Sequence, residues 1–244
     1  HIYLHHVGKN IMIGNFSVAY YGIVIAIGML AGLGIACWMA KRTGQKTDTY
    51  FDLALVAIIC SVIGARVYYV IFRWDLYKDD LLSVFNLRQG GLAIYGGVIA
   101  AIITVFVFSR VRKLSMGLLC DTAGLGLVLG QVIGRWGNFT NQEAFGNLIT
   151  NPDLQFFPYG VFIDDLQEWH QATFFYESAA NLILFIIMLI VARRVKKDGW
   201  MTVLYLVGYG AIRCFIEGLR TDSLYLIPGV RVSQVLSAVL IGVG

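Results

Sequence analysis

Seven apolar stretches follow one another along this chain and restrict the folds that it can adopt. They cover residues 18–40, 53–72, 92–109, 118–134, 173–192, 200–216 and 232–244. A helix that crosses a bilayer needs about 20 mostly apolar residues, and all but the last stretch approach that length. The chain is 58% hydrophobic and 14% charged, whereas soluble domains average about 45–50% and about 25%. The sequence therefore predicts an all-α integral membrane protein with about seven transmembrane helices, forming a single polytopic membrane domain over residues 1–244.

The basic residues between these stretches predict the orientation in the membrane. They gather after the first, third and fifth stretches, as Lys41, Arg42 and Lys46, then Arg110, Arg112 and Lys113, then Arg193, Arg194, Lys196 and Lys197. Loops rich in Lys and Arg stay in the cytoplasm. We therefore expect the N-terminus outside and the C-terminus in the cytoplasm. This loop placement also accounts for the net charge of +4, so we expect no nucleic-acid partner.

The segment 138–171 separates the fourth and fifth stretches and is predicted to be a small extracytoplasmic head. It contains two of the three prolines, Pro152 and Pro158, together with several acidic and aromatic residues. Aromatic side chains favour the headgroup level of a membrane. The sequence alone leaves open whether this head contains strands.

A dense polar motif, GRWGNFTNQEAFG at residues 134–146, follows the fourth apolar stretch. A helix cap with a snorkelling arginine would account for Arg135. It would not require Asn138, Asn141 and Glu143 as well, and polar groups at membrane depth usually face a polar cavity or a partner. We expect the glycines of the motif to allow a tight turn and close approach to a ligand.

Further polar residues are expected at the same outer end. They are Tyr21, Gln89, Tyr95, Tyr176, Glu177, Arg213, Glu217 and Arg220. The spacing of Arg213, Glu217 and Arg220 places them on one helix face, where they would form either a self-neutralising ladder or, with Arg135, a cradle for phosphate. A guanidinium group binds phosphate oxygens through two parallel hydrogen bonds.

Other polar groups have less specific interpretations. Glu143 and Glu177 would act as bases or, more commonly, orient the arginines. Arg66 lies inside the second stretch, where an unpaired charge costs about 3 kcal/mol, and is interpreted as structural. Asp121 is interpreted as a helix-start or pairing residue. The GxxxG spacing of Gly28 and Gly32 predicts close helix packing.

The motif resembles the signature G-R-x-G-N-F-x-N-x-E-x-x-G of the prolipoprotein diacylglyceryl transferase family. Matches continue at Tyr21-Gly22, at Gln89-Gly90-Gly91 with Gly96-Gly97, across 173–178, and at Arg213, Glu217 and Arg220. The resemblance implies a bacterial plasma-membrane enzyme with its site toward the outer leaflet. It implies transfer of the diacylglyceryl group of phosphatidylglycerol to the thiol of the lipobox cysteine in a prolipoprotein signal peptide. Glycerol phosphate would leave, and no metal or other cofactor would be needed.

The resemblance also implies roles for individual residues. The catalytic candidates are Arg135, Arg213, Glu217, Glu143 and Tyr95. The substrate-binding candidates are Arg135, Asn138, Asn141, Gly146, Tyr21, Arg220, Tyr176 and Glu177. Arg135 and Arg213 would hold the lipid phosphate, with Glu217 and Glu143 orienting them. The membrane lipids themselves would be the remaining partners.

Two positions depart from the family pattern. Many members have histidine where this chain has Tyr95, and a His-Pro pair where it has Gln171-Ala172. A neutral phenol is a poor base but a good hydrogen-bond donor, so Tyr95 is expected to position substrate. Glu143, a phosphate oxygen and water all remain open as acceptors of the thiol proton.

Two other classes of function compete with an enzyme. A transporter or channel would carry ionisable residues at several depths, whereas here they gather toward one face. A lipid-binding scaffold without catalysis would share the arginines. The chain has no Ser-His-acid arrangement, P-loop or metal-ligand spacing, so we expect that any nucleophile comes from a substrate.

Overall fold

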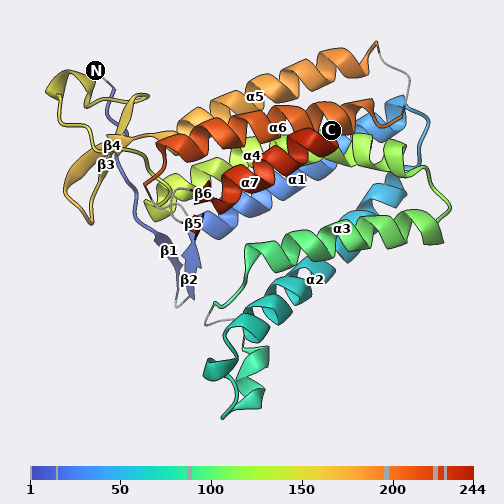
Figure 1. Ribbon diagram of the computed structural model, residues 1–244, viewed down its shortest axis with the longest axis horizontal. Coiled ribbons are helices and arrows are strands. Elements are labelled where there is room, and N and C mark those ends of the chain that lie inside the picture. Colours follow the sequence, from blue (N-terminus) through green and yellow to red (C-terminus); the bar gives the residue numbers. More distant parts are fainter. Residues whose placement is uncertain (1, 15, 87–89, 195–197, 222–224, 228–229) are drawn as a thin grey trace. The chain divides into compact units, whose positions relative to one another are not determined.

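A computed structural model describes residues 2–14, 16–86, 90–194, 198–221, 225–227 and 230–244 (Figure 1). The chain divides into two compact units, each described by itself. Unit 1 comprises residues 1–36 and 121–244, and unit 2 comprises residues 37–120.

Unit 1 is built around helices that run alongside one another (Figure 1). They are α1 (Tyr20–Arg42), of which residues 20–36 belong to this unit, α4 (Met116–Asn141), which belongs to it from residue 121 on, α5 (Thr173–Ala192), α6 (Trp200–Leu219) and the short α7 (Val232–Val243). Helices α1 and α4 meet at two pairs of glycines. A side-chain carbon on Gly28 would lie 3.0 Å from the Gly130 carbonyl oxygen, and Gly32 and Gly126 approach each other more closely still. The close packing predicted from Gly28 and Gly32 is therefore confirmed.

The helices have the length and the surface of membrane spans. Within the described residues, six of them are long and apolar enough to cross a bilayer, namely α1 to α6. Large apolar side chains such as Ile63, Ile103 and Ile183 are exposed on these helices, as expected for groups that face lipid. The predicted all-α membrane fold is confirmed. A seventh crossing and the orientation stay predictions, since α7 has only 12 residues.

The motif at residues 134–146 differs locally from its prediction. The fourth span was expected to end near Gly134, but α4 continues to Asn141. Glycine weakens a helix without ending it, and the residues that follow Gly134 keep their backbone bonds within the helix. The tight turn comes later, where Gln142 and Ala144 adopt φ values of 51° and 57°.

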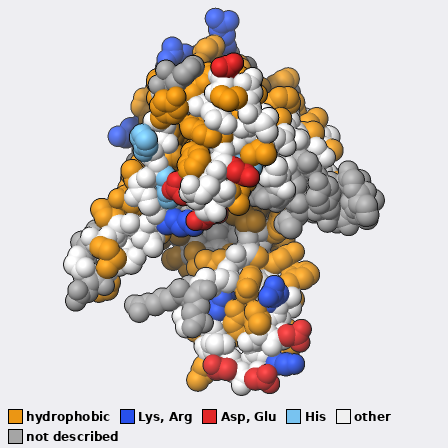
Figure 2. All heavy atoms as spheres, turned by 90° about the vertical axis from the view of Figure 1, so that its left-hand side faces the viewer, with side chains coloured by type: hydrophobic (Ala, Val, Ile, Leu, Met, Phe, Trp, Pro, Cys, Tyr) orange, Lys and Arg blue, Asp and Glu red, His pale blue; other side chains and the backbone are white. Residues whose placement is uncertain are grey.

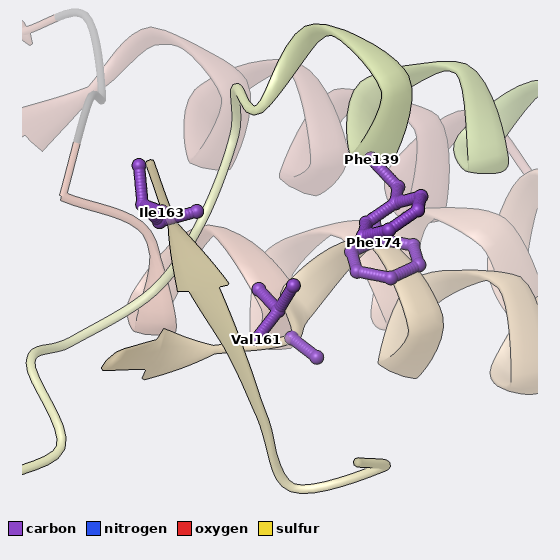
Figure 3. Close-up of a cluster of buried hydrophobic side chains, with 5 residues drawn as sticks. Phe139, Val161, Ile163 and Phe174 are labelled. Carbon is purple, nitrogen blue, oxygen red and sulfur yellow. The ribbon is translucent and has the colours of Figure 1, made fainter. Parts of the chain in front are cut away.

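A small head follows α4 and contains two antiparallel strands. Strand β3 (Gly160–Ile163) pairs with β4 (Glu168–Gln171), and a 3-10 turn, η4 (Pro152–Leu154), precedes them. The strands that the sequence left open are therefore present. A buried cluster joins this hairpin to the bundle: Phe139 of α4 lies against Phe174 of α5, next to Val161 and Ile163 of β3 (Figure 3).

The N-terminal segment also packs on the head. Residue Ile2 pairs with Phe157, and His6 bonds both the Asp164 carboxylate and the Thr140 carbonyl oxygen. Two short hairpins complete unit 1: β1 (Asn10–Ile13) with β2 (Phe16–Ala19), and β5 (Tyr225–Ile227) with β6 (Val230–Arg231).

At the opposite end of α4, Asp121 pairs with the start of α6. Its carboxylate accepts hydrogen bonds from the backbone N–H groups of Gly199 and Thr202 and from the Thr202 hydroxyl. A carboxylate at a helix N-terminus satisfies backbone donors and opposes the helix dipole. The interpretation of Asp121 as a pairing residue is confirmed.

Unit 2 contains α2 (Thr47–Phe72), α3 (Ile94–Val111) and two 3-10 turns, η1 (Trp74–Leu76) and η2 (Leu81–Phe85). Arg66 organises the segment that leads into α3. Its guanidinium donates five hydrogen bonds of 2.7–3.1 Å to the carbonyl oxygens of Ser83, Val84, Asn86, Gly90 and Gly91. The structural role expected for Arg66 is therefore confirmed.

Candidate functional site

A buried carboxylate, Glu177, brings together three helices of unit 1 at the end that carries the head. It lies in the second turn of α5, and its side chain is 3% exposed. Arg135 of α4 places Nη2 2.8 Å from Glu177 Oε1, and Arg213 of α6 donates from Nη1 to Oε2 at 3.1 Å. Arg213 also places Nη2 2.8 Å from Glu217 Oε2, one turn further along α6.

The cations of this cluster are more accessible than the carboxylates. The side chains of Arg135 and Arg213 are 21% and 16% exposed, against 3% and 2% for Glu177 and Glu217. An approaching anion therefore meets guanidinium groups first. Buried carboxylates behind them offset their charge and hold their orientation.

Two contacts of the cluster are ion pairs without hydrogen-bond geometry. Although Arg135 and Arg213 lie at 2.8 Å from Glu177 Oε1 and Glu217 Oε2, neither oxygen has a hydrogen-bond partner among the residues that the structure describes. The short distances establish the electrostatic pairing, and the N–H directions leave both oxygens able to accept further bonds.

The polar side chains of the motif form a second group beside the arginines. Asn138 and Asn141 donate side-chain hydrogen bonds of 3.0 and 3.4 Å to Glu143 Oε1, and the Glu143 N–H donates to the Asn138 carbonyl. Glu143 is exposed. Figure 2 looks toward this end of unit 1, where acidic side chains lie among hydrophobic ones. The Glu143 carboxylate therefore lies at the surface and is held there by the side-chain amides of Asn138 and Asn141.

Gln142 connects the motif to the head. It is buried, with its amide nitrogen donating to the Phe162 carbonyl at 3.1 Å and its amide oxygen accepting from the Asp164 N–H at 2.9 Å. The motif's turn and the β3–β4 hairpin are thus fixed to each other, which keeps Glu143 at the end of α4.

Tyr21 and Tyr209 line the arginine cluster. A side-chain carbon on Gly137 would lie 2.9 Å from the Tyr21 ring, so glycine at this position lets the ring pack directly on α4. Tyr21 is close enough to Arg135 and Glu143 to interact with both charges, and Tyr209 of α6 also lies close to Arg135. Tyr21 therefore lies where the sequence analysis expected it.

Arg220 and Gly146 meet through their backbones. Arg220 follows the end of α6 in an extended conformation and pairs with Gly146 as an antiparallel bridge. Arg220 therefore does not continue the helical face of Arg213 and Glu217, as its spacing had predicted, because α6 ends at Leu219. It still lies close enough to Arg135 for the two cations to repel each other.

The remaining predicted site residues have separate positions. Tyr176 is half-buried and its hydroxyl donates to the Tyr159 carbonyl oxygen. Gly146 is buried between its bonds to Gln171 and His170. Tyr95 belongs to unit 2, as the second residue of α3. Gln89 lies outside the described residues.

The chain is similar over nearly its whole length to a known family. Residues 9–244 match the sequence profile described as prolipoprotein diacylglyceryl transferase.

The chain belongs to this family.

Curated relatives carry the name phosphatidylglycerol–prolipoprotein diacylglyceryl transferase. One from Clostridium botulinum (strain Langeland / NCTC 10281 / Type F) is 42% identical over 229 residues, covering 92% of this chain and 89% of its own length. Relatives from Bacillus mycoides (strain KBAB4) and Bacillus cereus (strain Q1) are each 42% identical, over 233 and 237 residues. These alignments cover 93% and 95% of this chain, and 85% and 87% of the relatives.

The structure adds polar residues to this arginine cluster that the sequence analysis did not single out. Tyr209 is one turn before Arg213 on α6. Gln131 is one turn before Arg135 on α4, and Asn181 is one turn after Glu177 on α5. All three continue the polar faces of their helices into the bundle. A search for polar residues four positions from each predicted charge would have found them.

Proposed function

We propose that this transferase binds the phosphate of phosphatidylglycerol with Arg135 and Arg213 and passes the diacylglyceryl group to the thiol of a lipobox cysteine. The enzyme transfers the diacylglyceryl group of phosphatidylglycerol to prolipoproteins, the first step of lipoprotein maturation. The observation that carries the assignment of the phosphate site is the difference in exposure within the cluster: two partly exposed guanidinium groups pair with two buried carboxylates.

The chemistry suits this arrangement. The cysteine thiol gives its proton to Glu143, a phosphate oxygen or water, and its sulfur forms a bond to the glyceryl carbon. The bond from that carbon to the phosphate oxygen breaks, and glycerol phosphate leaves with the electron pair of that bond. Negative charge grows on the leaving oxygen, and fixed guanidinium donors stabilise such charge in the transition state. Arg135 and Arg213 come from different helices and both pair with Glu177, so their guanidinium groups lie close together where a phosphate can replace the carboxylate as their partner.

The surrounding groups have complementary roles in the proposal. Asn138 and Asn141 hold Glu143 at the surface, where amide and carboxylate groups suit the hydroxyls of the glycerol headgroup. Glu217 fixes the second terminal nitrogen of Arg213. Tyr21 closes the site on the α1 side through its packing on Gly137.

A transfer assay tests the proposal. The purified protein is incubated with phosphatidylglycerol vesicles and a lipobox peptide, and the peptide mass and released glycerol phosphate are measured. We expect the peptide to gain one diacylglyceryl group for each glycerol phosphate released. Phosphatidylcholine vesicles and a peptide with serine in place of the cysteine are the controls. Equal modification of the serine peptide would exclude the thiol as acceptor.

We also propose that the site faces the outer leaflet. A cysteine introduced in place of Asp165, in the head, is expected to react with membrane-impermeant thiol reagents in intact cells. A cysteine in place of Lys46, between α1 and α2, is expected to be protected. The four natural cysteines are first replaced by serine or alanine. The reverse labelling pattern would contradict an outer-leaflet site.

A further inference from the structure

A buried amide next to the arginine cluster has no partner. Asn181 lies on α5 with none of its surface exposed, and neither its side-chain nitrogen nor its oxygen forms a hydrogen bond within the described residues. Leaving a buried donor or acceptor unsatisfied costs about 1–3 kcal/mol. The cost matters more inside a bilayer, where no water replaces the missing partner.

Asn181 shares a face of α5 with Glu177. The two residues are four positions apart, so their side chains are neighbours on the helix surface. Ser178, between them in sequence, donates to the Val132 carbonyl oxygen of α4 at 2.7 Å, which shows that this part of α5 packs on α4. Asn181 therefore lies one helical turn deeper in the bundle than the contacts of Glu177 with Arg135 and Arg213.

The unmet hydrogen bonds of these two residues are complementary. Asn181 has an amide donor without an acceptor, and Glu177 Oε1 is an acceptor without a hydrogen-bond donor. Within the described residues, the Oε1 atom forms an ion pair with Arg135 but no hydrogen bond. A change of side-chain rotamer at either residue would turn two unsatisfied groups into one charge-assisted bond.

We infer that Asn181 is a positioning residue that donates to the Glu177 carboxylate when Arg135 and Arg213 turn toward a lipid phosphate. This inference rests on the proposed function. A phosphate that takes the terminal nitrogens of Arg213 competes with Glu177 and Glu217, which hold those nitrogens now. Glu177 then needs a replacement donor, because an uncompensated buried charge is strongly destabilising. Asn181 supplies one without adding a charge.

The inference predicts opposite effects on resting stability and on lipid binding. Asn181→Leu removes an unpaired amide and keeps a branched side chain, and Asn181→Ala removes it without adding volume. In nanodiscs of phosphatidylcholine, we expect Asn181→Leu to raise the midpoint of thermal unfolding by about 2–4 °C. With phosphatidylglycerol as substrate, we expect both variants to lower kcat/KM by about tenfold. Leu184→Met, one turn deeper on the same helix, is the packing control and should leave both quantities near their wild-type values.

Each outcome of the experiment is decisive. If both Asn181 variants lose thermal stability in phosphatidylcholine, the amide is paired in the resting protein and the inference is wrong. If stability rises or holds while phosphatidylglycerol binding and turnover are unchanged, the amide has no role in the bound state and the inference is also wrong. A wild-type protein that neither binds phosphatidylglycerol nor transfers its diacylglyceryl group would overturn the proposed function, and this inference with it.

Discussion

Two arginines on membrane helices, Arg66 and Arg213, show what separates a structural guanidinium from one that can bind a ligand. Arg66 is 7% exposed and donates five hydrogen bonds to five backbone carbonyls. A guanidinium has five N–H donors, so Arg66 has no donor left. Arg213 is more exposed, and its contacts within the described residues go to two carboxylates through its terminal nitrogens.

The difference in partners has a physical consequence. Carbonyl oxygens of the backbone cannot move without breaking the fold, so Arg66 is fixed to the segment that it organises. Carboxylate partners can exchange for a phosphate of similar geometry and charge. Burial of an arginine in a membrane helix is therefore a poor guide to function by itself. The count of occupied donors and the kind of acceptor are better guides.

The largest effect is expected for Arg135→Lys. Lysine keeps the positive charge but loses the planar pair of donors. We expect the rate of diacylglyceryl transfer to fall about a hundred- to a thousandfold, as for removal of one donor from an oxyanion site. Thermal unfolding in phosphatidylcholine nanodiscs should stay close to wild type. Near-normal turnover of this variant would show that a positive charge suffices at this position and that two parallel N–H donors are not required.

Arg66→Met is expected to affect stability. The substitution leaves five carbonyl oxygens without their donor, and some of them will find water at the end of the helix. We expect a loss of about 2–3 kcal/mol in the free energy of unfolding, with faster amide hydrogen exchange in residues 90–93. Arg135→Lys, which keeps a positive charge next to the buried Glu177, is the control and should lose less. Equal losses of stability in the two variants would show that the number of occupied N–H donors does not distinguish a structural guanidinium group from one that can bind a ligand.

Much of this architecture was predictable from the sequence. Seven apolar stretches predicted about seven membrane helices because bilayer thickness imposes a length, and six helices reach that length within the described residues. Gly28 and Gly32 predicted a close contact because helices without side chains between them approach closely. Helix ends were less predictable. Gly134 suggested a break in α4, and the spacing of Arg220 suggested a continuing helix, yet α4 continues to Asn141 and α6 ends at Leu219.

The sequence allowed the charged residues of the candidate site to be predicted, but not which carboxylate pairs with which arginine. Arg135, Glu177 and Arg213 were each singled out, because charges on apolar helices are expensive. That one carboxylate serves two arginines depends on how three helices pack, which no local pattern encodes. The position of Asn181, four residues after Glu177, was a signal in the sequence, but its burial and its lack of hydrogen-bond partners within the described residues are known only from the structure.

Tyr95→Phe tests whether unit 2 contributes a group to the reaction as well as a scaffold. The change keeps the ring and removes the hydroxyl, so it deletes one hydrogen bond. If Tyr95 positions the phosphate or the thiol, we expect transfer to fall about ten- to a hundredfold. The rate should depend on pH in the same way as in the wild type. Full recovery of the variant at high pH would instead indicate that Tyr95 removes the thiol proton.

The smallest effect is expected for Asp165→Asn, which removes an exposed ion pair on the surface of the protein. Asp165 pairs with Lys9 at 3.1 Å between the head and the N-terminal segment, and the two side chains are 71% and 52% exposed. Water and salt screen such a pair, and both side chains lose freedom in forming it, so it contributes about 0.5 kcal/mol or less. We expect thermal unfolding and transfer rates close to wild type at physiological salt. A large loss of transfer without loss of stability would show that the head carries a charge used in substrate binding. The exposure of a charged side chain would then not be enough to distinguish the charges that bind substrate, as proposed for the arginine cluster, from ordinary surface charges.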